Sequence, residues 1–115
     1  MEDKEIKYSP LEEFISASTH AIGTLLSIYG LVMLIAASRT PAETASTSIF
    51  GAMMFLLFQS STLYHAMVNE TAKKVFRKID HSAIFLLIAG TYTPFFILVV
   101  PYPTSIALLA MTWYI

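Results

Sequence analysis

The sequence contains no cysteine and few charged residues, and each shortage excludes a class of protein. Without cysteine the chain has no disulfide and no thiolate chemistry. Charged residues make up 13% of the 115 residues and hydrophobic residues 56%, and the formal net charge is −1. That is too little polar surface to enclose a soluble core, so a membrane location is predicted. Phosphate-binding loops and long basic runs are also missing, so no nucleic acid is expected as a partner.

Three stretches lack charge altogether, and each exceeds the ~20 residues that a helix needs to cross the hydrocarbon. They cover residues 14–38, 44–69 and 81–115, and two prolines, Pro101 and Pro103, interrupt the last one. We therefore expect an all-α, polytopic transmembrane helix bundle. Its helices are predicted at about 14–38, 47–67, 80–100 and 104–115, behind a polar arm at 1–13.

The fourth predicted helix is too short to cross a bilayer. About 12 residues at 1.5 Å each span roughly 18 Å, against a hydrocarbon thickness of ~30 Å. We therefore expect three complete spans and a truncated fourth, and interpret the chain as part of a longer protein. The first span could be mistaken for a signal peptide, but the arm before it holds five acids and two lysines, the reverse of a basic leader.

Basic residues gather at one end of the predicted helices. The arm and the segment 69–79, interpreted as a basic turn, lie on the same side of three antiparallel helices. They carry all the lysines and arginines except Arg39: Lys4, Lys7, Lys73, Lys74, Arg77 and Lys78. The positive-inside rule predicts that this side, with the N-terminus, is cytoplasmic.

The same topology brings the ionisable residues of the spans to one depth. His20 lies early in the first helix, His65 late in the second, and Asp80 with His81 opens the third. Ionisable residues at membrane depth are costly and usually functional, so we predict a polar pocket at the cytoplasmic end. Residues three or four apart share a helix face, which predicts three inward stripes: Ser16, His20, Gly23, Ser27 and Gly30; Gly51, Phe58, Ser61 and His65; and Asp80, Ala83, Leu87, Gly90 and Pro94.

His65 is the candidate metal ligand, because neutral imidazole suits zinc and Ser61, one turn earlier, could orient the ring by a hydrogen bond. The alternative is an ordinary hydrogen bond between helices. Asp80 is the candidate catalytic residue, as a base or as a partner of metal-bound water. Its alternative role is to cap the third helix beside the basic residues.

The other ionisable residues have weaker assignments. His20 is a further ligand, a substrate contact or an interhelical hydrogen-bonding group. His81 follows Asp80 directly and so points to a different side of the helix, towards the membrane interface. Glu12 and Glu13 are interpreted as the acidic first turn of the first helix.

Three motifs in this order resemble those of the haemolysin III-like proteins, bacterial relatives of the progestin and adipoQ receptors and, more distantly, of the alkaline ceramidases. The motifs are STHAIG at 18–23, SSTLYH at 60–65, and DHSAIF at 80–85 running into IAGTYTP at 88–94. The resemblance covers essentially the whole chain.

The resemblance implies seven transmembrane helices in a bacterial plasma membrane and a zinc ion near the cytoplasmic face. The first zinc ligand would be His65, with Ser61 and Asp80 close to the metal and its water, and the reaction would be hydrolysis of a membrane lipid amide or ester. The other two ligands form an HxxxH pair on the last helix, which this chain lacks, so hydrolysis is expected of a complete form only. A pore-forming or membrane-lysing protein and a receptor-like lipid binder remain as alternatives.

Overall fold

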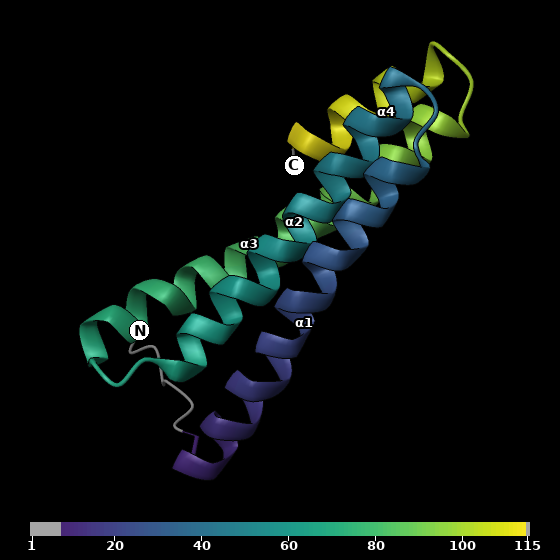
Figure 1. Ribbon diagram of the computed structural model, residues 1–115. Helices are drawn as coiled ribbons and strands as arrows, with labels where there is room; N and C mark the ends of the chain where they lie inside the picture. The colour runs from purple at the N-terminus through teal and green to yellow at the C-terminus, as the bar shows by residue number, and fades with distance from the viewer. Residues whose placement is uncertain (1–7, 115) are drawn as a thin grey trace.

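The computed structural model describes residues 8–114, and this part of the chain is all-helical, as predicted. Four helices follow one another: α1 (Pro10–Ala37), α2 (Pro41–Ala66), α3 (Glu70–Leu98) and α4 (Thr104–Tyr114). The first three run side by side and antiparallel, and the short α4 turns back beside the end of α3 (Figure 1).

The first two helices begin earlier than predicted because capping residues, and not the edge of the uncharged stretch, set their starts. The Ser9 side chain accepts a hydrogen bond from the backbone of Glu12 at the start of α1. The side chain of Thr40 and the side chain of Glu43 each accept from the other's backbone N–H at the start of α2, which is a capping box. Proline follows each cap, where its missing N–H costs nothing.

The segment 69–79 is not a turn, and this prediction was wrong. Asn69 caps α3, accepting from the backbone N–H of Ala72 at 3.0 Å, and the basic residues form the first turns of that helix. Lysine, arginine and glutamate are good helix formers, so a helix continues past the end of its apolar stretch. Asp80 therefore lies well inside α3, and its predicted capping role is wrong.

The helices form one open layer and not a closed bundle. The backbone of α2 packs against both α1 and α3, while those two do not approach each other. The chain extends 48 × 36 × 17 Å along its principal axes, so its smallest dimension is less than half of the next one. Both broad faces of the layer are consequently uncovered by the described residues.

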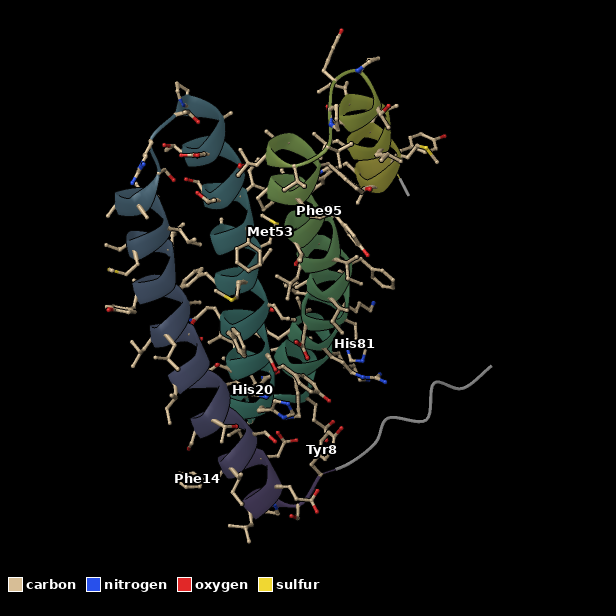
Figure 2. The ribbon with its side chains drawn as sticks, turned by 90° about the vertical axis from the view of Figure 1, so that its right-hand side faces the viewer. Tyr8, Phe14, His20, Met53, His81 and Phe95 are labelled. Atoms are coloured by element: carbon tan, nitrogen blue, oxygen red, sulfur yellow. The ribbon has the colours of Figure 1, made fainter. Side chains whose placement is uncertain are left out.

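The predicted small-residue stripes do face neighbouring helices. A Cβ added to Gly23 would come within 2.5 Å of the Phe58 ring, and one added to Gly90 within 2.8 Å of Met53. Met53 lies between α2 and α3 in Figure 2. Ser27 and Ala83, on the stripes of α1 and α3, are each only 1% exposed. Small residues thus allow the close approach of the backbones, as is common in membrane bundles.

Two of the described helices, α1 and α3, are long and apolar enough to cross a membrane. The prediction of three complete spans is therefore only partly supported, because α2 is long enough but not apolar enough to be identified as a span. Its first eight residues, 41–48, are largely polar or small, and a second polar run occupies 59–62. The chain is thus an all-α, membrane-type protein in which α1 and α3 are the clear apolar spans.

A polar contact holds α4 against α3. The indole Nε1 of Trp113 donates to the hydroxyl of Thr93 at 2.8 Å, and that hydroxyl donates to the carbonyl of Ala89. Thr93 is 1% exposed. The hydrogen bond between Trp113 and Thr93 thus fixes the apolar helix α4 against α3. Such a bond is stronger in low-dielectric surroundings than in water.

Candidate histidine site

The structure brings two of the candidate histidines together, from different helices. The imidazole rings of His20 on α1 and His65 on α2 lie with their centroids 5.5 Å apart. Figure 2 shows His20 at the lower end of the layer, on the side of α1 that faces α2. The convergence predicted from topology and helix faces is therefore present for these two histidines.

Ser61 bonds to His20 and not to His65, so the predicted partner was wrong. The Ser61 hydroxyl lies 2.5 Å from Nδ1 of His20 and its residue is 5% exposed. Ser61 sits on the side of α2 that packs against α1, where the imidazole that projects from α1 reaches its single hydroxyl. His20 thus makes the interhelical hydrogen bond that was one of its alternative assignments.

His65 is instead bonded to Glu13, which was predicted from the sequence only as part of the acidic first turn of a helix. Nδ1 of His65 is 2.9 Å from one carboxylate oxygen of Glu13, and the other oxygen is 3.0 Å from Nζ of Lys73. The side chains of these three residues are 10%, 16% and 27% exposed, in that order. The Glu13 carboxylate therefore joins α1, α2 and α3 at one point.

Lys73 is held by more than this ion pair. Its ammonium also donates to the carbonyl of Tyr64 at 2.9 Å and lies 4.7 Å from the centre of the Tyr64 ring. The aromatic ring and the carboxylate together offset the cost of partly burying the Lys73 ammonium.

The sequence did contain a sign that Glu13 belongs to this site. Glu13 and His20 are seven residues apart and therefore share a face of α1.

The bond to Glu13 determines which nitrogen of His65 remains available. A carboxylate can only accept, so in the neutral ring the tautomer that bonds to Glu13 carries its proton on Nδ1. Nε2 is then the nitrogen with a free lone pair. A histidine held by a carboxylate in this way is the usual arrangement around zinc, because the acid fixes the tautomer and makes the ligand more basic.

Asp80 and His81 are not bonded to this cluster. Nδ1 of His81 lies 2.8 Å from the carbonyl of Arg77 on its own helix, and the ring is exposed on the outer side of α3 (Figure 2). Asp80 is half-buried and makes no hydrogen bond or ion pair with any residue in the range 8–114. Asp80 therefore makes no direct polar contact with His20 or His65.

The described residues do not complete a metal site. Within 8–114 no three side chains of histidine, cysteine, aspartate or glutamate are grouped closely enough to hold an ion. His65 with its free Nε2 is suited to supply one ligand, and structural or catalytic zinc needs at least three from the protein. The described residues therefore suit one ligand of a metal centre and not a complete set of ligands.

Comparison with known proteins places the chain in a family. The model for proteins described as haemolysin-III related matches residues 8–115. Over 105 residues the chain is 45% identical to Hemolysin-3 of Bacillus cereus, covering 89% of this chain and 48% of that protein. It is 47% identical over 105 residues to the Hemolysin-3 homolog of Bacillus subtilis strain 168, covering 89% of this chain and 49% of the relative.

No solved structure matches the chain. The chain spans about half the length of the curated relatives it matches. The match over nearly all of its residues is nevertheless decisive for its membership, and the chain belongs to the haemolysin III family.

Proposed function

We propose that this chain forms the N-terminal part of a multispanning membrane protein whose complete site binds zinc at the cytoplasmic side and acts on a membrane lipid. The observation that carries the proposal is the bond between Glu13 and His65, which leaves Nε2 of a partly buried imidazole free to coordinate. The complete site would take its remaining ligands from outside the described residues.

The membrane arrangement behind this proposal has three crossings. The 26 residues of α2 extend ~39 Å at 1.5 Å each, enough for the ~30 Å hydrocarbon, and they lie antiparallel between two apolar spans. With α2 as a crossing, four basic residues at the start of α3 lie on one side and Arg39 on the other. The positive-inside rule then puts the N-terminus and the histidines at the cytoplasmic face of a bacterial plasma membrane.

Each residue of the cluster has a defined part in the proposed site. His65 would hold the metal, Glu13 would orient the ring, and Lys73 would hold the Glu13 carboxylate in place. Zinc, when bound, polarises a carbonyl and brings the pKa of its water close to neutrality. Asp80 is a half-buried carboxylate that makes no hydrogen bond or ion pair with the described residues, and it shares a face of α3 with Lys73, seven residues earlier, so it is the candidate to accept a proton.

The test is metal content, followed by turnover. Zinc per chain would be measured by mass spectrometry in detergent for a full-length family member carrying these motifs. We expect about one zinc, lost on replacing the histidine that corresponds to His65 by alanine, together with release of fatty acid from a ceramide-like lipid that depends on the metal. Zinc content that is unchanged in that variant would refute the role of His65.

A second candidate function is membrane lysis, the activity for which the relatives are named Hemolysin-3. The structural support is the open layer, whose two broad faces are free for association with other helices. Lysis predicts dye leakage from liposomes that persists both in His65→Ala and after chelation of zinc. Ligand-dependent stabilisation without leakage or product would instead identify a receptor-like lipid binder.

A further inference from the structure

A second polar feature lies at the end of the layer opposite the histidines. An open pocket of about 320 Å³ is lined by residues from the end of α1, the loop after it, the start of α2 and the end of α3. Three apolar side chains and four polar ones line it: Leu34, Ala37, Leu98, Ser38, Arg39, Glu43 and Thr47.

Most polar atoms of this pocket already have partners. The hydroxyls of Ser38 and Thr47 donate to helix carbonyls at 2.7 and 2.6 Å. One carboxylate oxygen of Glu43, Oε2, accepts from the backbone N–H groups of Arg39 and Thr40 at 2.6 and 3.3 Å. Two groups remain: the other oxygen of Glu43, Oε1, and the guanidinium of Arg39, neither of which bonds to any residue between 8 and 114.

We propose that this pocket binds the headgroup of an ethanolamine phospholipid, with the phosphate on Arg39 and the ammonium on Glu43. A guanidinium offers paired donors that match phosphate oxygens. The Glu43 carboxylate repels a headgroup that carries negative charge alone, such as that of phosphatidylglycerol. Its free oxygen can accept a hydrogen bond from the primary ammonium of an ethanolamine headgroup. A choline headgroup has no N–H to donate, so it is disfavoured.

The position of the pocket agrees with this occupant. Arg39 and Glu43 lie at the end of two apolar helices, where lipid headgroups are found when those helices cross a bilayer. Leu34, Ala37 and Leu98 provide an apolar wall for the glycerol and first methylene groups of the lipid. The inference depends on the membrane location of α1 and α3 and not on zinc binding.

The test is lipid retention by the full chain, purified in detergent with equal amounts of phosphatidylethanolamine, phosphatidylcholine and phosphatidylglycerol and analysed by native mass spectrometry. We expect the ethanolamine lipid to predominate and its retention to fall about fivefold in Arg39→Gln. Glu43→Gln keeps the capping box, since glutamine can make the same bond, but removes the charge, and should shift the preference towards phosphatidylglycerol.

Lys74→Gln is the matched control, because it removes one exposed positive charge from the other end of the layer. It should leave the lipid profile unchanged, and circular dichroism should show the same helix content in all variants. Equal retention of the three lipids, or equal losses in Arg39→Gln and Lys74→Gln, would overturn the proposal.

Discussion

The Glu13 carboxylate lies 2.9 Å from Nδ1 of His65 while its second oxygen contacts the ammonium of Lys73 at 3.0 Å. One acid near the start of α1 therefore connects the two other long helices of the layer. The backbones of α1 and α3 do not approach each other, so the ion pair between Glu13 and Lys73 links these two helices through their side chains. Loss of this acid should affect the whole layer and not only α1.

Replacement of Glu13 by glutamine is expected to destabilise the chain by about 1–3 kcal/mol, because a partly buried ammonium and imidazole lose their charged partner. Unfolding in increasing SDS, followed by circular dichroism, measures the effect. The control is Glu12→Gln, since Glu12 is exposed and its side chain has no partner among the described residues. Equal effects of the two variants would show that the acids act only on the helix dipole.

Ser61→Ala should cost about 1 kcal/mol, because it leaves His20 without its partner across the α1–α2 contact. Ser60→Ala is the comparison: Ser60 is 4% exposed but donates only to its own helix, to the carbonyls of Leu56 and Leu57. The same SDS titration should show little change for it. A larger effect at Ser60 than at Ser61 would contradict the role of the interhelical bond.

Gly90→Ala should weaken the α2–α3 contact by about 1–3 kcal/mol, the usual cost of overpacking. The added methyl would lie 2.8 and 3.0 Å from Cγ and Cβ of Met53, atoms close to the backbone that cannot swing away. Gly30→Ala is the control, since its nearest neighbour is Cε of Met54 at 3.8 Å. Gly30→Ala should be neutral or stabilise the helix by up to ~1 kcal/mol, and destabilisation by both variants alike would count against the described packing.

The proposed topology can be tested directly, because the chain has no cysteine of its own. Single cysteines would replace Ala42 and Lys74, which are both exposed. Ala42 lies at the start of α2, and Lys74 lies near the start of α3, at the opposite end of the layer. In intact bacteria an impermeant maleimide should label Ala42→Cys, and Lys74→Cys only after permeabilisation. Labelling of both from outside would mean that α2 does not cross the membrane, and the reverse pattern would place the N-terminus outside.

Much of the candidate site could be predicted, and the errors share a cause. The faces of the helices follow from the 3.6-residue period, so the meeting of His20, Ser61 and His65 was predictable. Their pairing was not, because a hydrogen bond depends on how far one helix is shifted and rotated against the next. A change of a few ångströms decides whether Ser61 meets one imidazole or the other.

The sequence by itself determined the helical class, the small-residue faces and the end at which ionisable groups gather, because composition and periodicity act locally along each helix. The tertiary structure decided that Glu13 pairs with His65 and Lys73, that Asp80 stays outside this cluster, and that three helices form an open layer. These outcomes depend on the register between helices, which is determined by the packing of many side chains at once.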